Sequence, residues 1–325
     1  MKHHWLWLKT AVLLLAFGLA VTSLAQKSPT FDEQGFLVRG LGYVRGENRH
    51  MRVGHPLGLN ALNASLLTAD ERVQLPTQFP EWQEPSFHRP AEQFLWELGN
   101  DVELTMFLAR LPTVWLGLLL AAVPARWAWA PSQRQAAGAL ALALIALDPN
   151  ILAHMRLTTT DLGLTFGATV AGFGLWLFLK RPSFLTLVLA AVGFAILQNT
   201  KFTAGLFVPL FTLIILVGRW HWWRSDDIPL GRSFLLLLIG YPLLSFFALW
   251  GMYGFQIGTL PADLPTLPQL GGLTLPLAHH LEQLLDIGGR VEQGATAFLL
   301  GDYSNDGWWY YFPVAFGVKT SGVLL

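Results

Sequence analysis

Two adjacent carboxylates, Asp32 and Glu33, lie where the first long apolar run of the chain ends, in the stretch "SPTFDEQGFLVRGLGYV". A carboxylate held at a membrane surface can act as a general base and remove a proton from an acceptor hydroxyl. Acidic residues are also common in the first turn of solvated helices, where the helix dipole favours them. The pair alone therefore indicates either an acid/base site or a helix start.

Five other polar residues lie at the ends of apolar runs: Arg110 in "FLARLPTVW", His154, Arg156 and Asp161 in "DPNILAHMRLTTTDLG", and Lys201 in "QNTKFTAG". Charges at such positions are costly and are candidates for function. Gathered on one membrane face, they would suit a phosphorylated lipid and an acceptor that loses a proton. The alternatives are a side chain that extends to the headgroups, ordinary loop polarity and a turn between helices.

These residues are positioned by apolar runs close to the ~20 residues that a spanning helix needs. The predicted spans are 5–25, 105–125, 136–153, 162–179, 183–199, 202–218 and 233–255. An eighth begins near Tyr310 and is still apolar at Leu325, so we expect the sequence to be truncated there. The first run also fits a cleavable signal peptide, but its length and its flanking tryptophans favour a retained helix.

The distribution of Lys and Arg predicts the orientation. With the N-terminus in the cytoplasm, the inside segments contain Lys2, Arg126, Arg134, Lys180, Arg181, Arg219, Arg224 and Arg232. The short outside segments contain only Arg156 and Lys201. The expected organisation is a first transmembrane helix (1–25), an outer-face loop that carries the catalytic acid (26–104), transmembrane helices two to seven (105–255), a second outer-face loop (256–309) and the start of a further transmembrane helix (310–325).

The two loops are expected to differ in structure. "FLVRGLGYV" and "PLGLNALNASLL" predict short amphipathic helices on the membrane surface, whereas "ERVQLPTQFPEWQEPSFHRP" predicts an irregular loop. In the second loop, "TLPADLPTLPQLGGLTLP" predicts an irregular stretch and "HHLEQLLDIGGRVEQGATAFLL" predicts a helix.

Composition supports a membrane protein and excludes some functions. Only 13% of the residues are charged and 53% are hydrophobic, against about 25% charged in a typical soluble protein. The formal net charge is zero, which gives no reason to expect nucleic-acid binding. The chain has no cysteine, which excludes disulfides and thiolate chemistry.

In order along the chain, "DEQGFLVRGLGYVRG", "HPLGLNAL", "ARLPTVWLGLL", "LDPNILAHMRLTTTDLGL", "LQNTKFTAGLFVPL" and "GWWYYFPVAFGVKT" resemble lipid-carrier-dependent glycosyltransferases of the C superfamily. The resemblance is to the family that includes protein O-mannosyltransferases and the aminoarabinose transferases of lipid A. It implies an all-α polytopic membrane protein, a multi-span helical bundle of glycosyltransferase C type with short interfacial helices in its outer-face loops. Its location would be a bacterial inner (plasma) membrane.

The resemblance implies that a sugar passes, with inversion, from a polyprenyl- or dolichyl-phosphate carrier to a protein, lipid or glycan acceptor on the outer or luminal face. Asp32 would be the general base, with Glu33 beside it, and Asp161 would position the acceptor or a cation. Arg110 and Lys201 match the positions expected to hold the donor phosphate.

Weaker candidates complete the predicted site. Arg156 and Lys319 are further phosphate ligands, and His55, His154 and Trp308 are acceptor or sugar contacts. No cofactor is certain, although Asp32, Glu33 and Asp161 could hold a divalent cation through oxygen ligands.

Two other classes of function stay open. A transporter or flippase of a polar or lipid-linked solute would share the intramembrane charges and interrupted helices, but its site would lie nearer the bilayer midplane. A non-catalytic scaffold would leave the one-sided placement of the charges unexplained.

Overall fold

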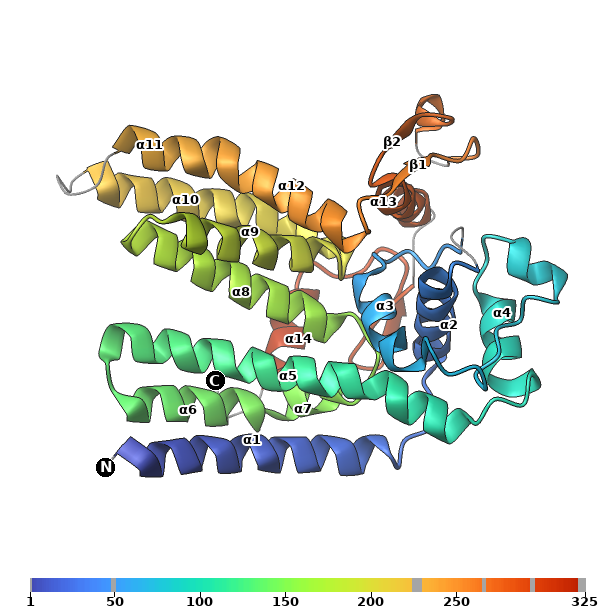
Figure 1. The fold of residues 1–325 in the computed structure, drawn as a ribbon, viewed down its shortest axis with the longest axis horizontal. Helices are drawn as coiled ribbons and strands as arrows, with labels where there is room; N and C mark the ends of the chain where they lie inside the picture. The colour runs from blue at the N-terminus through green and yellow to red at the C-terminus, as the bar shows by residue number, and fades with distance from the viewer. Residues whose placement is uncertain (1, 48–50, 224–229, 265–266, 293–295, 321–325) are drawn as a thin grey trace.

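The structure is a computed structural model that describes residues 2–47, 51–223, 230–264, 267–292 and 296–320. Most of the described chain is helical, and long helices run side by side in one bundle (Figure 1). Two hydrophilic parts of the chain, the first loop region (26–104) and the second loop region (256–309), meet at the end of this bundle that lies away from the N-terminus (Figure 1). Arg224 and the last five residues of the predicted eighth span, 321–325, lie outside the described residues.

Within the described ranges, four helical segments are long and apolar enough to cross a membrane, which indicates a membrane protein. They lie in α1 (Lys2–Leu24), in α5 (Val102–Ser132), in α8 (Asp161–Lys180) and across α11 (Leu230–Leu235), a π-helical turn at Leu236–Gly240 and α12 (Tyr241–Met252). The remaining helices of the bundle are α6 (Gln135–Ala146), α7 (Pro149–Met155), α9 (Phe184–Gln198) and α10 (Phe207–Trp223).

Three predicted spans differ from the helices found. The span predicted at 136–153 is broken into α6 and α7, which are bent by 60°. Pro149 starts α7, and the Asp148 carboxylate caps it by accepting from the backbone N–H groups of Asn150 and Ile151. The span predicted at 183–199 is a 15-residue helix, and the one at 202–218 begins as a 3-10 turn at Phe202–Leu206 before α10.

Small residues let α8 and α9 approach closely. A Cβ added at Gly167 would lie 2.5 Å from the backbone nitrogen of Leu197, and one at Gly174 would lie 2.5 Å from that of Ala190. Such contacts are typical of helix pairs in membranes, where close van der Waals packing replaces the hydrophobic effect. The packing holds the beginning of α8 against the end of α9, where the candidate residues Asp161 and Lys201 lie.

The first loop region folds into α2 (Phe31–Arg45), α3 (Gly58–Ala64), α4 (His88–Glu92) and short 3-10 and π-helical turns. The helices predicted from "FLVRGLGYV" and "PLGLNALNASLL" are present as α2 and α3. The stretch predicted as irregular contains only a 3-10 turn at Pro80–Gln83 and the start of α4. A core that includes Leu37, Trp82 and Phe94 holds these elements together.

The second loop region adds two short antiparallel strand pairs to the helical fold. Strand β1 (Ile257–Thr259) pairs with β2 (Thr274–Pro276), with Gly258 opposite Leu275, and β3 (Ala297–Leu299) pairs with β4 (Asp302–Ser304). Strands β1 and β2 take up the two ends of the stretch predicted as irregular (259–276), and the prediction missed them. Strands of three residues carry too little alternation to be recognised.

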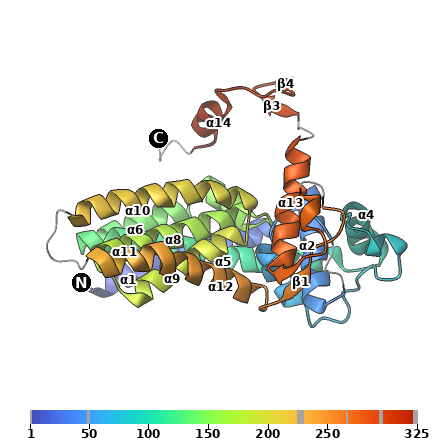
Figure 2. The ribbon, with the colours of Figure 1, turned by 90° about the horizontal axis from the view of Figure 1, so that it is seen from above.

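Two helices complete the second loop region and the chain after it. The helix predicted over 279–300 is present in part as α13 (Ala278–Glu292), which lies over α2 (Figure 2), whereas residues 297–299 of the predicted helix form β3. The predicted eighth span begins as α14 (Tyr311–Lys319), whose nine described residues are fewer than a span needs.

Candidate functional site

A buried ion pair joins Glu33 in the first turn of α2 to Arg110 in α5. The Nε and Nη2 atoms of Arg110 donate to the two carboxylate oxygens of Glu33 at 2.9 and 2.7 Å. Both side chains are at most 1% exposed. Such a two-pronged contact fixes the guanidinium and the carboxylate in one plane.

The same pair ties four parts of the chain together. Arg110 also donates to the backbone carbonyls of Leu24, Lys27 and Ser28, so that all five of its N–H donors are engaged. Glu33 accepts in addition from the N–H groups of Thr30 and Thr158. The pair therefore joins the end of α1, the beginning of α2, the middle of α5 and the loop before α8.

Electrostatics keeps Glu33 ionised. Burial raises the pKa of the Glu33 carboxyl, but the hydrogen bond and charge of Arg110 and the two backbone N–H groups lower it. The net result is a pKa below its ordinary value of 4.5. A carboxylate in this state is a structural anchor, and a donor phosphate would have to displace five existing bonds to bind Arg110. The predicted phosphate role does not suit the geometry of Arg110.

Asp32 shares the first turn of α2 with Glu33 but is exposed. A capping box between Thr30 and Glu33 fixes this turn. Because Glu33 also accepts from the N–H of Thr158, the turn that carries Asp32 lies beside the loop that leads into Asp161. Asp32 is thus an accessible carboxylate on a rigid support.

A second ion pair lies at the beginning of α8. The Nζ atom of Lys201 donates to the Asp161 carboxylate at 2.7 Å, and the Nδ1 atom of His154 lies 3.9 Å from the other oxygen. The side chains of Asp161 and Lys201 are 45% and 26% exposed. The His55 imidazole is close enough to interact electrostatically with Asp161. These two histidines, Asp161 and Lys201 form what we call the Asp161 cluster.

A close backbone contact positions Lys201. The N–H of Gly58, the first residue of α3, donates to the backbone carbonyl of Asn199 at 3.0 Å and to its side-chain oxygen at 3.2 Å. A Cβ added at Gly58 would lie 2.5 Å from Asn199 Nδ2 and 2.6 Å from the carbonyl oxygen. Only glycine therefore lets α3 hold the 199–201 turn in this place.

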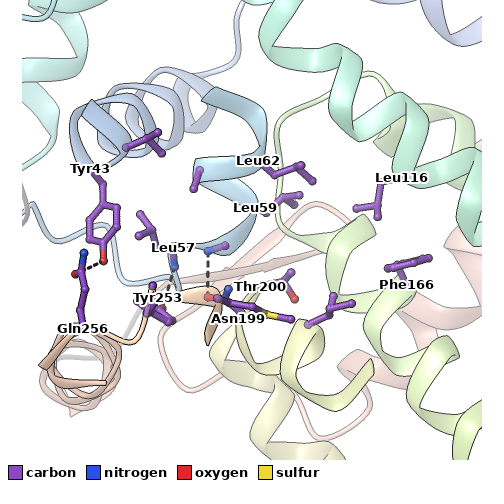
Figure 3. A pocket seen from close by; sticks show the side chains of 16 residues that line it. Tyr43, Leu57, Leu59, Leu62, Leu116, Phe166, Asn199, Thr200, Tyr253 and Gln256 are labelled. Atoms are coloured by element: carbon purple, nitrogen blue, oxygen red, sulfur yellow. Dashed lines mark hydrogen bonds between the residues drawn. The ribbon is translucent and has the colours of Figure 1, made fainter. Parts of the chain in front are cut away.

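A cavity of about 660 Å³, shown in Figure 3, extends to the turn that precedes Lys201. Apolar side chains form most of its wall, among them Leu57, Leu59, Leu62, Leu116 and Phe166. Asn199 and Thr200, the two residues before Lys201, also line it. We call this space the large cavity. It is large and apolar enough for part of a lipid chain, and one edge of it is polar.

The other predicted residues divide into two groups. Arg156 donates to the Ser23 hydroxyl of α1, so it belongs to the same end of the bundle. Lys319 has an exposed side chain, and its carbonyl accepts from Asn150 at the beginning of α7. Trp308 is half-buried just before α14. Among the described contacts, the structure does not bring Lys319 or Trp308 to the Asp161 cluster.

A divalent-cation site finds little support in the geometry. Within the described ranges, no three or more His, Asp or Glu residues are grouped so as to hold a metal ion. Both oxygens of Glu33 already accept two hydrogen bonds each. Of the three carboxylates predicted to share a cation, Glu33 has both oxygens occupied and Asp161 has one oxygen bonded to Lys201.

Sequence reasoning missed Arg39, which is 2% exposed. It donates to the carbonyls of Met51, His55 and Pro56 and contacts His279 Nε2 at 3.0 Å. Burial lowers the pKa of this guanidinium to about 10. Arg39 therefore holds the loop that carries His55 and links it to α13. The sequence does offer one indication of this role, because Arg39 is an arginine within the apolar run "FLVRGLGYV".

Comparison of the chain with protein-family models, with curated proteins and with solved structures finds no match in any of the three.

Proposed function

We propose that this protein is a membrane glycosyltransferase that moves a sugar, with inversion, from a polyprenyl- or dolichyl-phosphate carrier to a protein, lipid or glycan acceptor. The observation that carries the proposal is the half-exposed pair of Asp161 and Lys201, in which the lysine directly follows Asn199 and Thr200 of the large cavity wall. An apolar cavity accommodates a lipid chain, and a lysine that follows its polar residues along the chain can bind a phosphate. The ordered motifs that resemble the C superfamily support the same conclusion.

Each charged group has a role in this proposal. Lys201 binds the donor phosphate and stabilises the negative charge that builds on it as the sugar leaves. Asp32 removes the proton of the acceptor hydroxyl, a contribution of ~10²–10⁴-fold. Asp161 orients Lys201 and the acceptor, while Arg156 adds positive charge nearby. The transition state has oxocarbenium character.

Two of the predicted site residues receive a different role. Glu33 and Arg110 fix the positions of α1, α2, α5 and the 156–161 loop relative to one another, and they do not touch the substrate. The reaction face is the outer or luminal face of a plasma membrane, as the distribution of Lys and Arg predicts. In this arrangement the chain crosses the membrane several times.

The test uses the full chain in nanodiscs with a panel of polyprenyl-phosphate sugars, and mass spectrometry detects sugar release or transfer. We expect turnover with one donor, lowered ~10²–10⁴-fold by Asp32→Asn. Asp302→Asn replaces an exposed aspartate in β4 and is the matched control. Wild-type transfer by Asp32→Asn would refute the assignment of the base, and the lack of turnover with every donor would refute the proposed reaction.

A transporter or flippase is the second candidate, and the 60° break between α6 and α7 favours it. Interrupted helices commonly form the binding sites of secondary transporters. Proteoliposomes separate the two functions. Movement of a labelled lipid-linked sugar between leaflets without cleavage of the sugar–phosphate bond would support the transporter, and cleavage would support the transferase.

A further inference from the structure

A second, smaller cavity lies where the second loop region meets α2. Its volume is about 250 Å³, and its wall includes Tyr43, Tyr253, Gln256, His279 and Glu282. Tyr43, Tyr253 and Gln256 also line the large cavity, so the two spaces adjoin, and Figure 3 shows these three residues together. Neither Asp161 nor Lys201 is among the described residues that line the smaller space, which we call the small cavity.

Aromatic rings form one wall of the small cavity. The rings of Tyr43 and His279 lie 5.5 Å apart and are tilted by 38°. The Tyr253 hydroxyl accepts from the N–H of Leu57 at 3.3 Å and pairs with His280 at 3.1 Å, so its ring is held in place. Tyrosine offers an apolar face with a polar tip. This wall can therefore cover the C–H face of a small polar ring.

Neutral hydrogen-bonding groups also line the small cavity. The Oε1 atom of Gln256 accepts from the Tyr43 hydroxyl at 2.8 Å, which leaves the amide nitrogen of this exposed side chain to donate to a ligand. The hydroxyl of Thr259 pairs with that of Thr274 at 2.8 Å and keeps further hydrogen-bonding capacity. Both donors and acceptors are thus available.

The charged groups of the small cavity are paired with one another. The oxygens of Glu282 contact Arg52 Nε at 3.0 Å and His279 Nδ1 at 3.6 Å. Arg52 also contacts Asp263 at 3.1 Å, and Arg39 contacts His279. Of these groups, Glu282 and His279 line the cavity: an anionic ligand would meet the Glu282 carboxylate, and a cationic ligand would meet His279, which Arg39 contacts. The arrangement favours an uncharged ligand.

We propose that the small cavity binds one ring of an uncharged carbohydrate. The ring would pack its C–H face on Tyr43 and bond its hydroxyls to Gln256, Thr259 and the remaining lone pairs of Glu282. A space of about 250 Å³ equals roughly eight water molecules at ~30 Å³ each, which is suited to a single sugar ring. This binding goes beyond the proposed transfer, because it involves neither Asp32 nor the Asp161 cluster.

Saturation-transfer NMR tests the proposal on the full chain in nanodiscs. The probes are the neutral methyl pyranosides of glucose, mannose and galactose, with methyl glucuronide as the anionic probe. We expect at least one neutral probe to bind and the glucuronide not to bind. Gln256→Leu keeps the size of the side chain but removes its donors and acceptor, and it should lower the affinity about tenfold. Tyr43→Phe keeps the ring and should lower it about threefold.

Two further variants make the result decisive. Gln269 is exposed on the same loop region and is outside the described residues that line either cavity, so Gln269→Leu should bind the probe as the wild type does. Lys201→Ala should also bind normally, even though it impairs the proposed transfer. The proposal is overturned if the wild type binds no neutral probe, if Gln256→Leu binds as well as Gln269→Leu, or if the glucuronide binds more tightly than the neutral probes.

Discussion

Two ion pairs lie near one end of the helical bundle and differ in what surrounds them. The shortest N–O contact is 2.7 Å both between Glu33 and Arg110 and between Asp161 and Lys201. The first pair is fully buried and bonded to four parts of the chain, whereas the second is half-exposed and follows two residues that line the large cavity. The difference shows that a charged residue at the end of an apolar run can either stabilise the fold or bind a substrate. Which role it has depends on how many of its hydrogen-bonding groups are already engaged within the protein.

The largest effect is expected from Arg110→Ala, which leaves the Glu33 carboxylate buried without its partner. Loss of one member of a buried pair costs about 3–5 kcal/mol of stability. Unfolding of the purified protein in SDS measures this loss. Arg134→Ala removes an exposed arginine and should stay close to the wild type. An Arg110→Ala protein as stable as Arg134→Ala would show that the pair is not a scaffold.

Acid should weaken the same pair. The pKa of Glu33 is lower in the folded protein than its ordinary value of 4.5, so its contribution to stability is complete above pH 4.5. That contribution is lost as the pH falls through the folded-state pKa. Unfolding measured as a function of pH should show a decline below pH 4.5 that is smaller in Glu33→Gln. Identical pH profiles for the two proteins would contradict the assignment.

Gly58→Ala should disturb the pair of Asp161 and Lys201 although it changes neither residue. The new Cβ would press on the carbonyl oxygen of Asn199 and force the 199–201 turn to shift. Overpacking of this kind costs about 1–3 kcal/mol, and we expect weaker donor-lipid binding. The control is Gly205→Ala, because a Cβ there has no atom within 4 Å. Equal stability and equal donor affinity in the two variants would show that the contact of α3 with the 199–201 turn does not position Lys201.

The smallest effect on stability is expected from Asp161→Asn. A half-exposed pair contributes about 0–1 kcal/mol, so unfolding of this variant in SDS should nearly match that of the wild type. A loss comparable to that of Arg110→Ala would mean that the Asp161 cluster is a second scaffold, and the contrast between the pairs would disappear.

The sequence located the charged residues but could not assign their partners. Positions next to apolar runs singled out Glu33, Arg110, Asp161 and Lys201, and the structure joins these four into two pairs. Which carboxylate meets which cation depends on contacts between residues 40 and 77 positions apart. The composition of a short stretch of sequence does not show which distant residues it contacts.

Helix boundaries show the same limit. Hydropathy predicted one span across α6 and α7, but the capping of α7 by Asp148 bends the chain there. The three-residue strands β1 and β2 depend on each other for their hydrogen bonds and lack a pattern of their own. The resemblance predicts a site role for Lys319, and the aromatic ring of Trp308 predicts a contact with a sugar, but the described contacts do not bring either residue to the Asp161 cluster.

The most direct test of the central claim measures the affinity for the polyprenyl-phosphate donor in nanodiscs, comparing Lys201→Ala with Lys180→Ala. Lys180 is an exposed lysine at the opposite end of α8 from Asp161. We predict that Lys201→Ala weakens donor binding at least about tenfold, as expected for the loss of a charge-assisted bond worth ~1.5–3 kcal/mol, and that Lys180→Ala binds as the wild type does. Equal donor affinity in the two variants would contradict the claim that the Asp161 cluster holds the donor phosphate.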